Sequence, residues 1–358
     1  MPADSLTDLL NLGYPGGCDM IRGLCAAIAV FVLAAGTAGD AVTRPRIEST
    51  VTVAESVDHL NFPFLHRLDN GDLLLSHSEG VHTKTERGRW RRSRDGGATW
   101  ESYVGRAGPC LAQLFDGSML SLGFRIVHEE GSYRAVTYRS ADRGESWVGP
   151  EKAPLTFPFD GTFVLHRSIV EQPDGRLLAT GYGKREGDAR YRSFALASDD
   201  RGQSWQYLST IAYDPEVGSE GFCEPVMVHL RDGRLLCVMR TGSGEDLYQC
   251  WSVNGGRDWS VPVRVGARGV NPDLCLTADG PLVLTYGRPG VHVLVDRTGT
   301  GASWTDRLDV YAGIGCGYTS VEHIAPGRLL LTYSASSFCG TELEPGPNRI
   351  LAAFIALH

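Results

Sequence analysis

Six glycines mark places in this sequence around which polar side chains recur at fixed distances. These glycines are Gly71, Gly117, Gly175, Gly233, Gly280 and Gly327. Nine residues before them stand Phe62, Gly108, His166, Glu224, Asn271 and Tyr318. Seven or eight residues after them stand Glu79, Arg125, Tyr182, Arg240, Arg288 and Ser334. Carboxylate, phenol and guanidinium groups at equivalent strand ends are unsuited to a hydrophobic core, and they favour a polar pocket for a glycan.

Each of these glycines ends a tight turn between two apolar runs. Asn70-Gly71 and Asp174-Gly175 are examples, and such pairs predict β-hairpins with type I′ turns because glycine tolerates positive φ. The six hairpins recur 46 to 58 residues apart. The composition agrees, since 44 Gly, 18 Pro and 7 Trp in 358 residues favour many short strands over a helical bundle.

A second motif lies between the hairpins. It occupies Ser93–Trp100, Ser140–Trp147 and Ser198–Trp205, then Ser252–Trp259 with Asn in place of Asp, and a worn fifth copy at Gly301–Trp304. The Asp side chain can accept hydrogen bonds from N–H groups of its turn, while the Trp buries a large apolar surface. Five of the seven Trp residues therefore share one structural position.

The shared period leaves room for four short strands in each repeat, which is the size of a propeller blade. We predict an all-β fold, a six-bladed β-propeller of four-stranded antiparallel blades, as a single domain over residues 46–358. A strand at 47–54 is expected to pair with the last strand, at 349–357. That pairing would close the ring and remove exposed sheet edges.

The repeated motif is the Asp box, and with it the sequence resembles the sialidase (neuraminidase) superfamily over about residues 46–358. The resemblance implies that Glu224 deprotonates Tyr318, which then attacks the anomeric carbon of the substrate. A phenol suits a substrate with its own carboxylate, because a carboxylate nucleophile would be repelled. Arg240 and Arg288 match two of the three arginines that clamp the substrate carboxylate, which a guanidinium can bind in bidentate fashion. Asp boxes also occur in non-enzymatic propellers, so fold and function are separate predictions.

The sequence departs from the family in the first blade. Asn61 replaces the arginine that completes the clamp, and Ser334 stands where the family has the glutamate that pairs with that arginine. Because both members of one ion pair are missing, we expect a changed subsite. The family's acid/base Asp has no clear counterpart either, so we assign that role to Glu79, with Glu86 on the same loop as the alternative.

Four residues complete the expected substrate contacts: Arg125, His166, Asn61 and Asp273. For His166, a buried imidazole with satisfied hydrogen bonds is an equal alternative. Asp58 and Asp273 are further candidate acids. We expect no cofactor and no metal site, because the sequence has no CxxC pair and its Asp-Gly turns lack the oxygen-rich loops of calcium sites.

The N-terminus predicts export. Arg22 precedes an apolar run at 24–35 and small residues at 36–39, the order found in a secretory signal peptide, which we place in a leader of residues 1–39. An uncleaved anchor is the alternative. The run is shorter than the roughly 20 residues that a membrane-spanning helix needs. We therefore expect a secreted or periplasmic protein without stable membrane insertion.

The cysteine count and the net charge bear on disulfide formation and on the kind of partner that the protein binds. Seven cysteines lie outside the leader, and an odd number requires at least one free thiol or an external partner. Cys237 and Cys250 flank one hairpin and could pair, but we favour buried free thiols. A net charge of −8 with no basic run argues against nucleic-acid binding. We expect a monomer.

These observations together predict a secreted glycoside hydrolase of exo-α-sialidase-like type. It would release a terminal acidic sugar, sialic acid by resemblance, from a glycan or glycoconjugate. The missing arginine and glutamate make a different acidic sugar, or a neutral one, a competing substrate. The alternatives in other classes are a non-catalytic glycan-binding propeller and a glycan lyase on the same fold.

Overall fold

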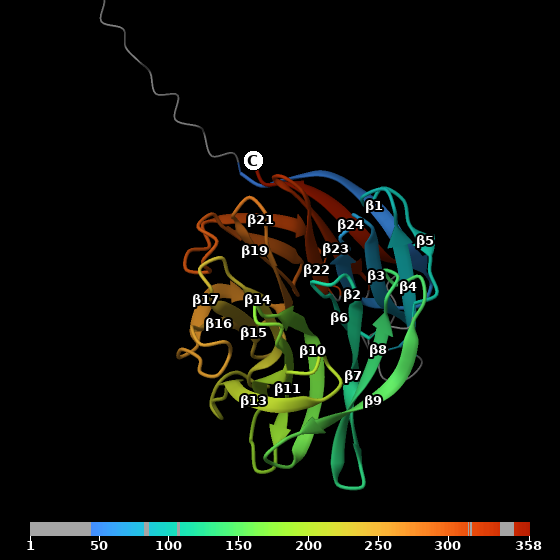
Figure 1. Cartoon of the computed structure of the whole chain (residues 1–358). Coiled ribbons are helices and arrows are strands. Elements are labelled where there is room, and N and C mark those ends of the chain that lie inside the picture. Colours follow the sequence, from blue (N-terminus) through green and yellow to red (C-terminus); the bar gives the residue numbers. More distant parts are fainter. Residues whose placement is uncertain (1–43, 82–85, 106–107, 314, 316, 337–346) are drawn as a thin grey trace, which may run out of the picture. The chain divides into compact units, whose positions relative to one another are not determined.

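All regular secondary structure in the described part of the chain is β. The computed structural model describes residues 44–81, 86–105, 108–313, 315, 317–336 and 347–358. These residues form 24 strands in five sheets and no helix (Figure 1). The all-β prediction is confirmed. The predicted leader, and with it the signal peptide, lies outside the described residues, as do Cys316 and Cys339.

Four of the sheets have four strands. One contains β2 (Leu60–Arg67), β3 (Leu73–Glu79), β4 (Arg87–Ser93) and β5 (Glu101–Ser102). The next contains β14 (Cys223–His229), β15 (Leu235–Arg240), β16 (Asp246–Ser252) and β17 (Val263–Arg268). A third contains β18 (Val270–Leu276), β19 (Leu282–Gly287), β20 (Val291–Asp296) and β21 (Asp306–Tyr311). The last contains β22 (Thr319–Ala325), β23 (Arg328–Ala335), β24 (Asn348–Ala356) and β1 (Arg46–Ser56).

The fifth sheet has eight strands and departs from the predicted pattern of separate four-stranded sheets. It contains β6 (Cys110–Gln113), β7 (Met119–Glu129), β8 (Ser132–Ser140), β9 (Val148–Thr156), β10 (Gly161–Glu171), β11 (Leu177–Arg185), β12 (Arg192–Ser198) and β13 (Trp205–Ala212). Two pairings join its halves, a parallel one between β9 and β13 and one between β7 and β10. Strands β7 to β13 thereby form a closed circuit of seven strands.

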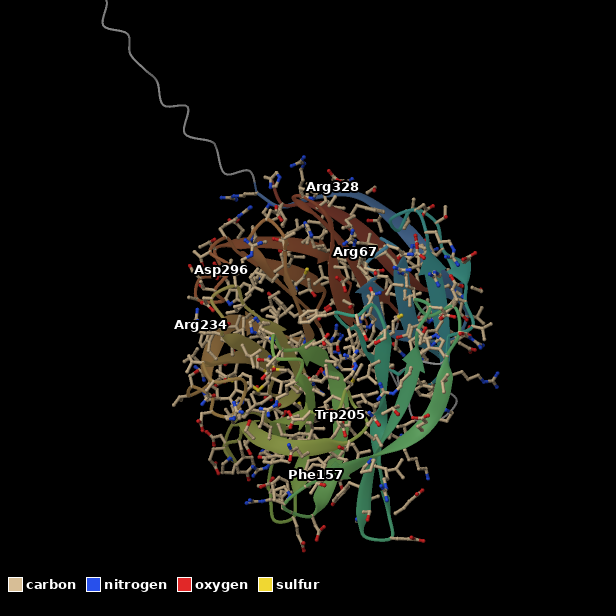
Figure 2. All side chains as sticks on the ribbon, in the orientation of Figure 1. Arg67, Phe157, Trp205, Arg234, Asp296 and Arg328 are labelled. Carbon is tan, nitrogen blue, oxygen red and sulfur yellow. The ribbon has the colours of Figure 1, made fainter. Side chains whose placement is uncertain are left out.

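An aromatic cluster fills this circuit and explains why the two halves join. Phe157 stacks on Phe163 at 4.3 Å between ring centroids and meets Phe194 edge to face at 5.4 Å (Figure 2 labels Phe157). Phe159 and Tyr207 extend the cluster at 4.9 Å. Burial of this much aromatic surface favours holding β9 against β13. The spacing of the turn glycines does not predict this aromatic cluster.

The six predicted hairpin turns are present, although their type differs from the prediction. All six turn glycines have positive φ, as at Gly71 with φ of 88°. Asn70 does not, so a type I′ turn is wrong here, because it needs positive φ at both central residues. The Leu68 carbonyl accepts from Gly71 N–H and the Leu68 N–H donates to the Asp72 carbonyl. This is a type I turn completed by a left-handed glycine.

The first strand of each hairpin packs on its counterparts in neighbouring repeats. Contacts run from β6 to β10, on to β14 and β18, then to β22 and β2. The circuit is completed by the Asp69 N–H, which donates to the Gln113 side chain of β6 at 2.7 Å. We call these six the inner strands. Near-equivalent positions of neighbouring inner strands are hydrogen-bonded, as in Met227 with Ser168 and Leu65 with Ser320, so we infer that their N-terminal ends lie at one opening of the ring.

The predicted closure by the N-terminal strand is confirmed. β1 pairs antiparallel with β24 from Arg46 opposite Ala356 to Ser56 opposite Asn348. Segments from the two ends of the described chain thus share one sheet, which leaves β24 without a free edge. The described cysteines, including Cys237 and its register partner Cys250, are free and buried, which confirms the favoured alternative for those positions.

The Asp boxes form the predicted turns. Asp95 accepts hydrogen bonds from the Thr99 N–H and hydroxyl at 2.9 and 2.6 Å, and these bonds lower its pKa to about 2. Asp142 and Asp200 repeat the pattern. Before the worn fifth copy, Asp296 accepts a hydrogen bond from the N–H of Gly301 at 2.7 Å. The motif is therefore a device that closes a turn, and its chemistry is structural.

Candidate active site

A strained backbone position recurs where the inner strands begin. Phe62, Glu224 and Asn271 have φ of 54°, 48° and 50°, in the left-handed region that non-glycine residues rarely occupy. At each of them the ladder to the next strand skips, as a β-bulge does. A proline follows each one (Pro63, Pro225 and Pro272), and proline cannot donate to the ladder. Such strain is typical of functional sites.

Glu224 is a buried carboxylate held in its charged form. Its Oε2 lies 2.7 Å from Arg240 Nε and accepts from the Asn271 N–H at 2.9 Å. Burial by itself raises the pKa of this carboxyl, but Arg240, His166 and the Asn271 N–H outweigh that effect and lower the pKa below its usual range. An ionised carboxylate shielded from water can act as a base.

Arg240 is engaged by two carboxylates of its own chain. Besides Glu224, it contacts Glu220 with 2.8 Å between Nη1 and Oε1. Its side chain is only 11% exposed. The predicted carboxylate clamp therefore needs qualification, because the positive charge of Arg240 is already balanced. Glu220 was not predicted, since it lies in the loop before β14 and outside the repeated spacing.

Tyr318 lies at the same end of the inner strands, directly before β22. Its ring packs against Phe62, with 4.4 Å between centroids, and against Val270. Its N–H donates to Ser334 Oγ at 3.1 Å. Because Glu224 bonds to the backbone of Asn271 and Tyr318 packs on Val270, the two predicted partners flank the first residues of β18. Both predicted partners therefore lie beside the start of β18.

Arg288 covers the ring of Tyr318. Its guanidinium carbon is 5.1 Å from the ring centroid, and its Nη1 donates to Ser243 Oγ at 3.3 Å. Arg288 also has positive φ, at 57°. The contact places a cation against the face of the Tyr318 ring. The structure therefore brings Arg288 to the predicted site.

His166 is a buried, neutral imidazole. Burial lowers its pKa to about 4, and its Nδ1 donates to the Pro225 carbonyl at 3.1 Å. Its ring also meets Tyr182 edge to face at 5.9 Å. Of the two predicted roles, this environment matches the satisfied core histidine. His166 packs behind Glu224 and supports the bulge at Pro225.

Glu79 does not fit the predicted acid/base role. Its Oε2 is 2.6 Å from Arg89 Nε, and its Oε1 accepts from Ser56 Oγ at 2.8 Å. Both contacts lower its pKa, whereas a general acid needs a raised pKa to hold its proton. Glu86, the alternative, is half-buried just before β4. Asp58 is exposed in the turn between β1 and β2.

Three of the predicted substrate contacts lie elsewhere. Asn61 is 0% exposed, so no substrate can reach it in this arrangement. Asp273 is buried below the opening and bound by Arg167, with 2.7 Å between Oδ2 and Nη1. Arg125 is exposed on β7 opposite Val164, and within the described residues no ion pair links it to the residues around Glu224. These positions fail because spacing fixes the strand end but not which way a side chain turns at a bulge.

Sequence reasoning missed Arg167 as a member of this region. The residue eight before the turn glycine is Pro63, Pro109, Pro225 or Pro272 in four repeats but Arg167 in the third. This difference could have identified Arg167 from the sequence, because a charged residue at a position that is otherwise mostly proline indicates a specific role.

A cavity of about 770 Å³ lies beside Arg288, between β17 and β21. Pro289, Gly290 and Arg268 are among its lining residues, whereas Glu224 and Tyr318 are not. It is therefore a neighbour of the candidate site and not its centre. No group of three or more His, Cys, Asp or Glu in the described part of the chain could hold a metal ion. Nor does that part contain a helix able to span a membrane.

Known proteins share this architecture. A family model described as a BNR repeat-like domain matches residues 105–330, more than half of the chain. A protein of unknown function from Dyadobacter fermentans has a TM-score of 0.69 at 21% identity, covering 88% of this chain and 99% of that one.

Two glycoside hydrolases have the same fold. An α-L-arabinanase from Penicillium chrysogenum, complexed with arabinobiose, has a TM-score of 0.66 at 18% identity, covering 87% of this chain and 99% of that one. A mutant of the NanB sialidase from Streptococcus pneumoniae has a TM-score of 0.64 at 13% identity, covering 85% and 70%. At these identities the similarity shows a shared fold.

Proposed function

The chain belongs to the family of BNR repeat-like domains, and on that premise we propose that it is an exported glycoside hydrolase with a sialidase-like centre. The observation that carries the proposal is the meeting of Glu224, Asn271 and Tyr318 at one end of three successive inner strands. Export rests on the signal-peptide pattern before residue 40.

We propose that the fold is a six-bladed propeller. Six inner strands follow one another around the ring, and each begins a hairpin. In this interpretation the eight-stranded sheet is two blades, β6–β9 and β10–β13, fused by the β9–β13 and β7–β10 pairings. The aromatic cluster around Phe157 supports that fusion.

The proposed reaction retains the configuration of the sugar. Glu224 accepts the phenolic proton of Tyr318 while the phenolic oxygen bonds to the anomeric carbon. The bond from that carbon to the leaving oxygen breaks, and an acid on the β3–β4 loop supplies the proton that this oxygen takes. Water then cleaves the phenol–sugar bond with the same loop group as base, and Tyr318 regains its proton from Glu224.

Glu86 is the carboxylate that we propose as this acid/base. Glu79, the last residue of β3, forms an ion pair with Arg89 and accepts a hydrogen bond from Ser56, which leaves Glu86 as the acidic residue between β3 and β4. Glu86→Ala should therefore lose turnover of substrates with poor leaving groups far more than of activated aryl glycosides, because an aryl oxide leaves without a proton.

A terminal acidic sugar is our first candidate substrate, with sialic acid as its best-known member. A phenol nucleophile avoids repulsion of an anionic sugar, and Arg288 offers a cation at the site. A neutral sugar is the second candidate. One observation favours it: the charge of Arg240 is already balanced by Glu220 and Glu224.

The experiment is a turnover assay of the purified mature chain on fluorogenic sialosides, uronosides and neutral glycosides. The proposal expects turnover of one class and its loss in Tyr318→Phe and Glu224→Gln. Tyr103→Phe, which removes a phenol at the outer rim, is the matched control and should retain activity. Binding of glycans without turnover would favour the lectin-like alternative. An unsaturated product that absorbs in the near ultraviolet would indicate a lyase.

A further inference from the structure

Arg167 reaches across the ring from β10 below the candidate site. Its backbone has φ of 63°, within a bulge between Leu165 and Ile169, and its side chain is 5% exposed. In the other bulged repeats the left-handed residue comes one position earlier, at Phe62, Glu224 or Asn271. In the third repeat the left-handed residue is therefore the arginine itself, at the position that is proline in four other repeats.

The guanidinium of Arg167 contacts three other inner strands. Its Nη1 lies 2.7 Å from Asp273 Oδ2 on β18, and its Nη2 donates to the Thr319 carbonyl on β22 at 2.8 Å. Its Nη1 also donates to Ser320 Oγ at 3.3 Å. The guanidinium carbon lies 4.8 Å above the ring of Phe64 on β2. One side chain thus joins strands from four repeats.

The Thr319 carbonyl connects this arginine to the candidate site. It belongs to the residue directly after Tyr318, and it also accepts from Asn271 Nδ2 at 3.1 Å. Thr319 Oγ1 returns a hydrogen bond to the Asn271 carbonyl at 3.2 Å. The Asn271 N–H in turn donates to Glu224. A continuous set of buried contacts therefore runs from Arg167 through Thr319 and Asn271 to Glu224.

We propose that Arg167 is a positioning residue that sets the distance between Glu224 and Tyr318. Its planar fork meets a carboxylate and a carbonyl at once, which a lysine ammonium on its flexible stem does not reproduce. Asp273 is its counter-ion and is further fixed by Ser320 Oγ and the Val321 N–H, at 2.8 and 2.9 Å. This role rests on the proposed function, because it concerns the same catalytic pair.

A second buried Arg–Asp pair supplies a matched control. Arg92 and Asp72 lie near the outer rim, with side chains 1% and 10% exposed, against 5% and 10% for Arg167 and Asp273. The axial double variant is Arg167→Met with Asp273→Leu, and the control is Arg92→Met with Asp72→Leu. Each removes both charges of a pair, so neither leaves a buried ion without a partner.

We expect the axial variant to lose about 100-fold in kcat with KM within about threefold of wild type, since a misplacement of about 1 Å has such an effect. The control should keep its kcat within about threefold. Arg167→Lys should fold and show an intermediate loss of kcat. If the double variant does not fold, the kcat of Arg167→Lys is compared with that of the control instead. Equal kcat values in axial and control variants would overturn the proposal.

Amide hydrogen exchange tests whether Arg167 holds the backbone around Asn271 and Tyr318 in place, and it needs no substrate turnover. In the axial variant, peptides covering 269–274 and 317–321 should exchange about tenfold faster, while peptides of the outer strands keep wild-type rates. Unchanged exchange in these two peptides would overturn the positioning role. If the wild-type chain turns over no glycan while exchange changes as expected, the proposed enzyme function fails and the structural coupling by Arg167 stands.

Discussion

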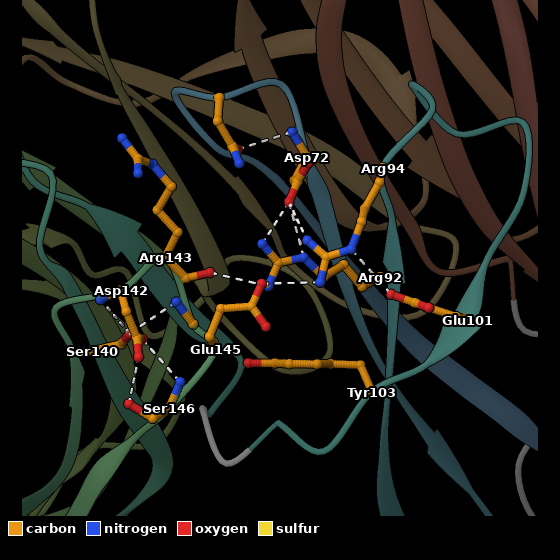
Figure 3. A network of polar contacts seen from close by, with 12 residues as sticks. Asp72, Arg92, Arg94, Glu101, Tyr103, Ser140, Asp142, Arg143, Glu145 and Ser146 are labelled. Carbon is orange, nitrogen blue, oxygen red and sulfur yellow. Dashed lines mark hydrogen bonds and ion pairs between the residues drawn. The ribbon is translucent and has the colours of Figure 1, made fainter.

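Two buried Arg–Asp pairs illustrate how differently the rim and the axis of this molecule are built. At the rim, Arg92 of β4 meets Asp72, with 3.0 Å between Arg92 Nε and Asp72 Oδ2 (Figure 3). On the axis, Arg167 meets Asp273 at 2.7 Å. The two pairs are almost equally buried, but they differ in how many other charged partners lie within reach of each member.

The rim pair is one part of a network with spare partners. Asp72 is also 3.1 Å from Arg94, and Glu145 of the next Asp box lies 2.9 Å from both Arg92 and Arg94 (Figure 3). The Arg143 carbonyl accepts from Arg92 as well. Loss of one member leaves each remaining charge with another partner. These contacts join consecutive sheets and are open to solvent on one side.

The axial pair has no such reserve. No second carboxylate of the described residues lies within ion-pair distance of Arg167, and its buried Nε has no hydrogen-bond partner there. Its contacts come from strands more than a hundred residues away in sequence. Several interchangeable ion pairs thus hold neighbouring sheets together at the rim, whereas on the axis one ion pair joins strands that are far apart in sequence.

The largest contrast is expected for catalysis. Glu224→Gln on the axis should reduce turnover by about 10²–10⁴-fold, the range for loss of a general base. Glu145→Gln at the rim makes the same chemical change and should leave turnover within about twofold. Steady-state kinetics on the substrate found in the panel decide this. A comparable loss in both variants would mean that the rim takes part in the chemistry.

Single charge removals should separate the two pairs by stability. Arg167→Met leaves Asp273 buried without its counter-ion, for which we expect a loss of about 3–5 kcal/mol in the free energy of unfolding. Arg92→Met leaves Asp72 with Arg94, so we expect about 1–2 kcal/mol. Urea unfolding of both variants measures the difference. If the rim variant loses as much as the axial one, redundancy at the rim is not protective.

The pH profile tests the ionised state of Glu224. Its lowered pKa means that the base stays charged, so kcat/KM should decline only as the pH falls below the usual glutamate range near 4.3. In Arg240→Met the effect of burial is no longer offset by the arginine charge, so the pKa of Glu224 should rise and the acidic limb should move to higher pH. An acidic limb that stays in place would show that another group controls it.

The smallest effect belongs to a single Asp box. Asp95→Ala removes the acceptor of the Thr99 N–H and hydroxyl, for which we expect about 1 kcal/mol, as for a lost helix cap. The contribution of Asp95 should be full above the unfolded pKa near 3.9 and fade as the pH falls toward about 2, because the folded-state pKa is the lower one. Thermal unfolding at pH 7 and pH 3 measures it. Turnover should not change.

Local and repeated features could be predicted from the sequence. The turn glycines, the Asp boxes and the pairing of β1 with β24 follow from short motifs and alternating apolar residues. Counting from the turn glycines also selected Glu224 and Arg240, which form an ion pair, and Arg288 and Tyr318, which are in contact. These contacts could be anticipated because equivalent strand ends lie at the same end of neighbouring sheets.

Non-local and side-chain features could not be predicted in this way. The fusion of two repeats by Phe157 depends on packing between strands far apart in sequence. Glu79 has the right strand position, but Arg89 of the neighbouring strand β4 forms an ion pair with its carboxylate. Asp273 turns to Arg167 because a bulge at Asn271 changes which way the chain faces. In each case a side-chain contact that the repeated spacing does not encode decides the role.

Covalent trapping tests the central claim most directly. The chain is incubated with a fluorinated glycosyl fluoride of the sugar that it turns over, because fluorine next to the anomeric carbon slows breakdown of a glycosyl–enzyme intermediate. Peptide mass spectrometry then locates the sugar. Our account predicts one adduct, on the phenolic oxygen of Tyr318, that is absent in Tyr318→Phe. An adduct on Glu224 or on any other side chain would contradict it.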